Sequence, residues 1–122
     1  MVEYHKIIHY FPNMENNDQL SAIFYALSDT RRRRMLEGLA EAPKTVGALA
    51  ELTGMRISAA SKNIAVLEEA GLLYKSRQGR ATLCHMNFDI WRSVAGYVAI
   101  HAQFWAGRLD ELAQHLDKVG DI

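Results

Sequence analysis

The last third of the chain carries the pattern that constrains its fold most, because apolar residues recur there at alternating steps of four and three. The spacing runs from Trp91 to Val119 and predicts one long helix, 88–119, with an a/d heptad seam. A small domain does not need so long a stripe to pack one helix, so we expect a second copy to cover it. The predicted dimer interface comprises Trp91, Val98, Ala102, Trp105, Leu109, Leu112 and Leu116.

The length of 122 residues, 49% of them hydrophobic, is sufficient for one domain with one modest core. Residues 1–17 show no sustained periodicity and are interpreted as a mobile N-terminal tail, which leaves 18–122 as the domain. No apolar stretch approaches the roughly 20 residues that span a bilayer. The apolar patch near the N-terminus also lacks a signal-peptide cleavage site. We therefore expect a cytoplasmic protein with no membrane partner.

Helix signals divide the chain before the long helix into four shorter helices. Apolar residues from Leu20 to Leu27 have helical spacing, and Asp29 is suited to cap the helix that follows. Thr45 is suited to cap a short third helix, and Gly54 to end it in a left-handed conformation. A fourth helix is predicted over 57–70. The second and third helices are separated by a break at 41–44.

Two strand-like runs follow within 72–86, with Gly79 between them. They predict a hairpin. The complete order predicts a mainly α fold with a small two-stranded β-hairpin. This is the order of a winged helix-turn-helix, and the heptad seam of the long C-terminal helix would join two copies of it.

The fourth helix is the predicted DNA-reading element. If Ile57, Ala60, Ile64 and Leu67 point inward, small and polar side chains point outward, and the major groove admits one such helix. The hairpin adds cations that can reach the DNA backbone. The predicted DNA-binding residues are Arg56, Ser58, Ala59, Ser61, Lys62, Asn63, Lys75, Arg77 and Arg80.

The charge distribution agrees with this placement. The whole chain has a formal net charge of zero, yet residues 56–85 hold five Lys/Arg against two Asp/Glu. The flanking segments are slightly acidic. Because phosphate affinity depends on where cations stand, a neutral chain with a basic middle segment remains compatible with double-stranded DNA as a partner.

The sequence also resembles the ArsR/SmtB family of bacterial repressors from Phe24 to about Leu116. The resemblance is carried by ALSDTRRRRML at 26–36, TVGALAELTGM at 45–55, AASKNIAVLEEAGLL at 59–73, Gly79-Arg80, and FWAGRLDEL at 104–112. The last stretch is similar to the C-terminal helix of a branch that does not sense metals. The resemblance implies a homodimer that binds a palindromic operator and represses transcription, with the terminal helices forming the dimer interface.

The chain departs from the family pattern at several positions. Thr30 follows Asp29 where the family often has proline, Arg56 replaces a capping serine, and Asn63 replaces a histidine. The helix at 46–53 lacks the cysteine motif of thiolate sensors. The C-terminal helix lacks the Asp/His spacing of the other metal sensors. We therefore expect no metal site and no cofactor.

Some alternatives remain open. Cys84, the only cysteine, is most simply a small buried hydrophobe, although a thiol sensor is an alternative. His5 and His9 with Glu3 are an alternative metal site, and an unidentified small-molecule effector is an alternative partner between the long helices. A winged-helix module that binds protein and not DNA is the rival function. An enzyme is not expected, because no glycine-rich phosphate loop, carboxylate pair or nucleophile–base spacing is present.

Overall fold

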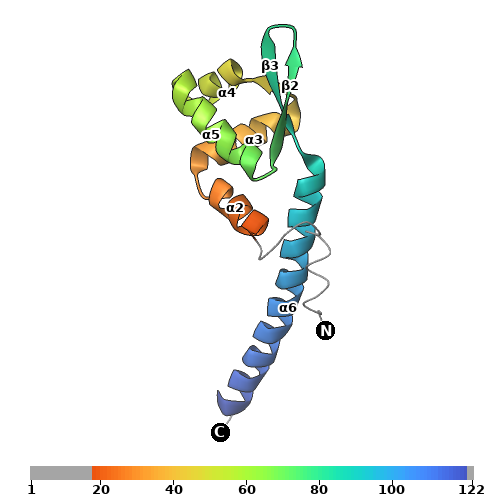
Figure 1. The fold of residues 1–122 in the computed structure, drawn as a ribbon. Helices are drawn as coiled ribbons and strands as arrows, with labels where there is room; N and C mark the ends of the chain where they lie inside the picture. The colour runs from red at the N-terminus through yellow and green to blue at the C-terminus, as the bar shows by residue number, and fades with distance from the viewer. Residues whose placement is uncertain (1–17, 121–122) are drawn as a thin grey trace. The chain divides into compact units, whose positions relative to one another are not determined.

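The computed structural model describes residues 18–120, and the tail 1–17 with its histidines lies outside them. These residues belong to two compact units, one ending at Trp91 and one beginning at Arg92. The helices are α2 (Asp18–Leu27), α3 (Thr30–Glu41), α4 (Val46–Thr53), α5 (Ile57–Glu69) and α6 (Phe88–Gly120), and the strands are β1 (Lys44–Thr45), β2 (Leu73–Gln78) and β3 (Ala81–Met86). Figure 1 shows this order.

The predicted helix boundaries are confirmed at their caps. The Asp29 carboxylate accepts hydrogen bonds from the backbone N–H of Arg31 and Arg32 at the start of α3. The Thr45 hydroxyl accepts from the N–H of Ala48 in the first turn of α4. Gly54 ends α4 at φ 66°, in the left-handed region that favours glycine. Local hydrogen-bonding chemistry therefore places these helix ends.

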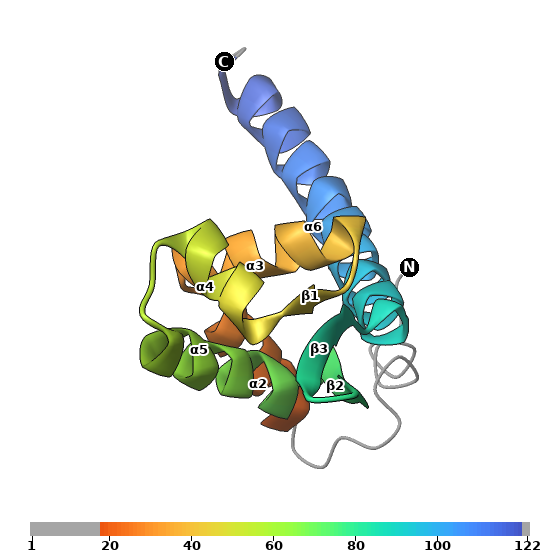
Figure 2. The same ribbon diagram turned by 90° about the horizontal axis from the view of Figure 1, so that it is seen from above.

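The predicted hairpin is present, but it belongs to a three-stranded antiparallel sheet of order β1-β3-β2. Leu73 pairs with Met86 at the base of the hairpin, and Gln78 with Ala81 near its tip. Lys44 of β1 pairs with Cys84, on the other side of β3 (Figure 2). The two-stranded hairpin is therefore confirmed. The additional strand β1 was not predicted, because its two residues are too few to display the alternation that identifies a strand.

The core of the unit that ends at Trp91 draws on every helix from α2 to α5 and on the sheet. Its largest fully buried side chains are Ile23, Met35, Leu49, Ile64, Leu67, Leu72, Leu73 and Cys84. Ile57, which was expected to point inward with the rest of the α5 stripe, is 64% exposed. Ile57 is the first residue of its helix, and the buried stripe of α5 begins one turn later, at Ala60.

Candidate nucleic-acid interface

A helix-turn-helix is formed by α4, the turn at Gly54 and Met55, and α5. The backbone N–H of Met55 donates to the carbonyl of Ala50 at 2.9 Å and closes the turn. Within α5, Ala60, Ile64 and Leu67 are fully buried. Because this stripe fixes the rotation of α5 about its own axis, it also determines which side chains the helix presents to solvent.

The exposed side of α5 carries the predicted small and polar residues. Ser58, Ser61 and Lys62 are exposed, and Ala59 is half-buried. Arg56 precedes the helix and is exposed, and its side chain makes no cap hydrogen bond. Hydroxyls and one ammonium group suit contact with base edges and phosphates.

Asn63 differs from the other residues predicted on this helix. Its side-chain oxygen accepts a hydrogen bond from Arg32 at 3.0 Å, and its nitrogen donates to the carbonyl of Ala59 at 2.9 Å. The Met55 sulfur lies 3.8 Å from the same nitrogen. The Asn63 amide therefore uses its hydrogen-bonding capacity inside the fold.

Arg32 is the residue at this site that the sequence reasoning missed. A run of four arginines on a helix is most simply interpreted as a solvated face, yet Arg32 is only 7% exposed. Its guanidinium donates to the carbonyls of Ala26 at 2.7 Å and Tyr25 at 3.1 Å, and also to Asn63. It thus connects the end of α2, the start of α3 and the middle of α5. No sequence signal distinguishes Arg32 from its neighbours, because burial depends on what packs against each helix face.

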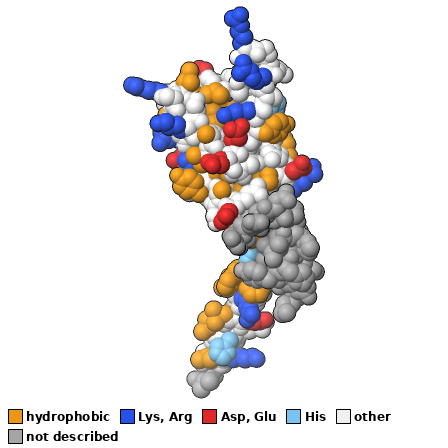
Figure 3. Space-filling model, in the orientation of Figure 1, with side chains coloured by type: hydrophobic (Ala, Val, Ile, Leu, Met, Phe, Trp, Pro, Cys, Tyr) orange, Lys and Arg blue, Asp and Glu red, His pale blue; other side chains and the backbone are white. Residues whose placement is uncertain are grey.

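The wing contributes cations beside the helix-turn-helix. Residues 70–88 contain Lys75, Arg77 and Arg80 and no Asp or Glu. Arg77 and Arg80 are exposed near the Gly79 turn, and Lys and Arg side chains are visible at the tip of the hairpin in Figure 3. The Lys75 ammonium lies 3.3 Å from the Glu68 carboxylate of α5. Lys75 is therefore partly neutralised, whereas the tip presents a net positive charge.

The apolar stripe of α6 lies on an exposed face of that helix. Its large side chains from residue 98 to 119 are between 48% and 61% exposed: Val98, Trp105, Leu109, Leu112, Leu116 and Val119. Ala102 is also exposed. Trp91, at the start of the stripe, is half-buried and lines a pocket with residues of α3 and β3. A row of exposed large apolar residues on one helix face is typical of an interaction surface.

Both the sequence and the fold match those of known proteins. Residues 27–74, which include the helix-turn-helix, match a family model described as a helix-turn-helix domain. A crystal structure of an ArsR family transcriptional regulator superposes with a TM-score of 0.67 at 32% identity, covering 75% of this chain and 95% of the other. The chain belongs to the ArsR family. Since this is a family of transcriptional regulators, the chain is not an enzyme.

Two mycobacterial relatives of this ArsR-family chain are also informative. A homodimeric winged helix-turn-helix DNA-binding domain of Mycobacterium bovis superposes with a TM-score of 0.60 at 26% identity, covering 76% of this chain and 92% of that domain. An HTH-type transcriptional regulator of Mycobacterium tuberculosis is 37% identical over 62 residues. That match covers 51% of this chain and only 27% of the relative, so the chain spans about a quarter of that protein's length.

In this ArsR-family chain Cys84 is a core residue of β3. Its side chain is fully buried, as the sequence predicted, and burial raises the pKa of the thiol. A raised pKa lowers the fraction of reactive thiolate, which disfavours the thiol-sensor alternative. Within residues 18–120, no group of three or more His, Cys, Asp and Glu side chains is arranged to hold a metal ion. No helix in the same range is long and apolar enough to cross a membrane.

Proposed function

We propose that this ArsR-family chain is a cytoplasmic, homodimeric repressor that binds palindromic double-stranded DNA with α5 and the wing. The observation that carries the proposal is the division of α5 into a fully buried stripe and an exposed side with Ser58, Ser61 and Lys62. The Mycobacterium bovis relative, described as a homodimeric winged helix-turn-helix DNA-binding domain, supports it.

Each group of residues has its own role in the proposal. Ser58, Ala59, Ser61 and Lys62 enter the major groove, where hydroxyls read several base edges and lysine reaches guanine or phosphate. Arg56 contacts the backbone beside them. Arg77 and Arg80 reach the backbone next to an adjacent minor groove, with Lys75 as a weaker contributor because of Glu68. Asn63 acts indirectly, by holding the helix to Arg32.

Dimerisation completes the proposed site. Two copies joined through the α6 stripe would each present one α5 helix. A symmetric dimer of this kind reads two half-sites about 34 Å apart, which explains why its operator would be palindromic. Bound to a promoter, such a dimer blocks access of the polymerase.

The first experiment selects fragments of the source genome that the full chain binds, and then measures affinity for one of them at increasing salt. Phosphate contacts release counterions, so affinity for DNA must fall steeply as salt rises. The rival module that binds only protein would show no such binding. Selected fragments without a shared palindrome would contradict the proposed dimeric readout.

The second experiment replaces Lys62 with alanine. The change removes one cation from each α5, and we expect affinity for the selected fragment to fall roughly tenfold or more. Lys118→Ala is the matched control, because it removes the same charge from an exposed position at the far end of α6. Equal affinities for the two variants would mean that α5 does not read the DNA.

A further inference from the structure

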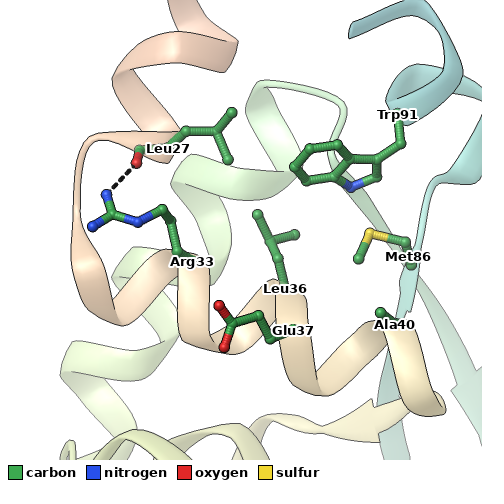
Figure 4. Close-up of a pocket in the computed structure, with 7 residues that line it drawn as sticks. All are labelled: Leu27, Arg33, Leu36, Glu37, Ala40, Met86 and Trp91. Atoms are coloured by element: carbon green, nitrogen blue, oxygen red, sulfur yellow. Dashed lines mark hydrogen bonds between the residues drawn. The ribbon is translucent and has the colours of Figure 1, made fainter. Parts of the chain in front are cut away.

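A pocket of about 350 Å³ lies in the unit that ends at Trp91. Figure 4 shows its walls, which come from the end of α2, one side of α3, the end of β3 and the start of α6. The lining residues are Leu27, Arg33, Leu36, Glu37, Ala40, Met86 and Trp91. Most of these side chains are apolar, and the volume falls within the range of about 300–1,000 Å³ typical of small-molecule sites. The proposed DNA contacts on α5 and the wing use none of these residues.

The Trp91 indole nitrogen gives this pocket a specific chemistry. Among the described residues it is the one buried side-chain polar atom without a hydrogen-bond partner. In Figure 4 the indole projects toward Leu36, with its nitrogen on the edge turned toward Met86. An N–H group that is shielded from water and unpaired is unfavourable, because it has lost its hydrogen bonds to water and gained none in return. A ligand that brings an acceptor to this donor would remove that cost, and the flexible Met86 side chain can move to admit it.

The two charged residues of the lining indicate which ligands fit. The Arg33 guanidinium already donates to the carbonyl of Leu27 at 2.6 Å and to the Thr30 hydroxyl at 3.3 Å. It is therefore held at the junction of α2 and α3. The Glu37 carboxylate repels an anion in the pocket, and the Arg33 guanidinium repels a cation. The walls thus favour a neutral molecule.

We propose that this pocket binds a small, neutral, mainly apolar ring compound whose carbonyl or ether oxygen accepts a hydrogen bond from Trp91 Nε1. An engineered cavity of about 150 Å³ can hold benzene. The pocket is more than twice that size, so it has room for a two-ring molecule. This site is distinct from a pocket between the long helices, which was the sequence-based alternative for an effector.

The pocket is also placed to influence DNA binding, an inference that rests on the proposed function. Helix α3 presents Arg33, Leu36 and Glu37 to the pocket and Arg32 to Asn63 of the recognition helix α5. A ligand that shifts α3 therefore acts on α5 through the hydrogen bond between Arg32 and Asn63. We expect the bound compound to weaken DNA binding.

The binding test uses the full chain and two matched probes, the bicyclic ketone 1-tetralone and the hydrocarbon tetralin, which lacks the oxygen. The chain has two tryptophans, so its NMR spectrum contains two indole N–H signals, which Trp91→Phe and Trp105→Phe assign. Millimolar tetralone should move the Trp91 signal and leave Trp105 nearly unchanged. An unmoved Trp91 signal would overturn the proposal.

The preference for the ketone isolates the hydrogen bond from general hydrophobic binding. The ratio of the tetralin to the tetralone dissociation constant should fall about fivefold or more in Trp91→Phe, because phenylalanine keeps the ring and loses the donor. It should stay constant in Trp105→Phe. Ala40→Leu, which fills the pocket from an exposed position on α3, should abolish binding of both probes. An unchanged ratio in Trp91→Phe, or binding by Ala40→Leu, would count against the site.

The regulatory part is tested by adding tetralone to the complex with a selected DNA fragment. The dissociation constant for DNA should rise for the wild-type chain and stay constant for Ala40→Leu. If tetralone binds the pocket and DNA affinity does not change, the regulatory role is overturned. If the chain without tetralone binds no DNA fragment, the proposed function fails, and the NMR result still decides whether the pocket binds the probe.

Discussion

Of the four consecutive arginines in α3, Arg32 is buried whereas Arg31, Arg33 and Arg34 are exposed. Successive helix positions are rotated by about 100°, so a run of identical residues faces several environments. The Arg32 side chain also lies over the Tyr25 ring, with the guanidinium carbon 5.1 Å from the ring centre. A buried guanidinium is tolerated because its planar group of donors meets three acceptors. Through these contacts Arg32 joins the end of α2 to the middle of α5.

We predict that Arg32→Ala lowers the free energy of unfolding by roughly 2–4 kcal/mol, because it removes charge-assisted hydrogen bonds and leaves the Ala26 carbonyl without this donor. Arg34→Ala, at an exposed position of the same helix, should change it by less than about 0.5 kcal/mol. Urea unfolding of both variants at one protein concentration measures the difference. Equal stability of the two variants would mean that the buried contacts contribute nothing net.

At the scale of secondary-structure elements, caps and glycines set where the helices of the winged helix begin and end. Asp29 opens α3, Thr45 opens α4 and Gly54 closes it. Each acts on backbone groups that have no partner within the helix. Helix α5 has no such side-chain cap, since Arg56 occupies that position. Its position therefore depends on the buried stripe and on the hydrogen bond between Arg32 and Asn63.

The Asp29 cap predicts a pH dependence. Hydrogen bonds from the backbone N–H of Arg31, and then of Arg32, hold the pKa of the carboxyl below its ordinary value of 3.8. Because the folded state favours the ionised form, its contribution to stability is present above that value and is lost as pH falls through the folded pKa. Asn in this position keeps an acceptor that does not titrate. Below pH 3.8 we therefore expect the wild type to lose free energy of unfolding relative to Asp29→Asn. Urea unfolding of both proteins over a range of pH measures this. A difference in stability that does not change with pH would contradict the role of the ionised cap.

At the scale of the whole molecule, the apolar stripe of α6 is a surface that the described residues leave exposed. Large side chains spaced by three and four residues remain about half exposed along the described helix. In an a/d seam such side chains pack against those of a facing helix and lose their contact with water. The proposed homodimer would bury them. It would also carry two copies of α5 at a fixed distance from each other.

We predict that Leu112→Asp leaves the chain monomeric where the wild type forms the proposed dimer, because the seam would then bury an unpaired carboxylate. Affinity for a palindromic fragment should fall steeply with it. Gln114→Asp is the matched control, since it adds the same charge on the opposite side of α6. Analytical ultracentrifugation of both variants decides the matter, and a dimeric Leu112→Asp would show that this stripe does not form the interface.

The sequence alone determined the order of the helices, the helix ends at Asp29, Thr45 and Gly54, the hairpin around Gly79, and the family. These features were readable because they depend on local chemistry: a cap acts on the next turn, and a glycine permits a left-handed residue. The inward face of α5 could likewise be predicted from Ala60 onward, because the spacing of its apolar residues follows from helix geometry alone.

Only the tertiary structure decided which arginine of α3 is buried, that Asn63 bonds within the fold, and that β1 joins the sheet beside Cys84. The same holds for the pocket at Trp91, a residue that the heptad spacing assigned to the dimer seam. Each of these depends on contacts between segments far apart in the chain. Periodicity predicts which side of a helix is apolar, but what packs against that side is decided by the other elements of the fold.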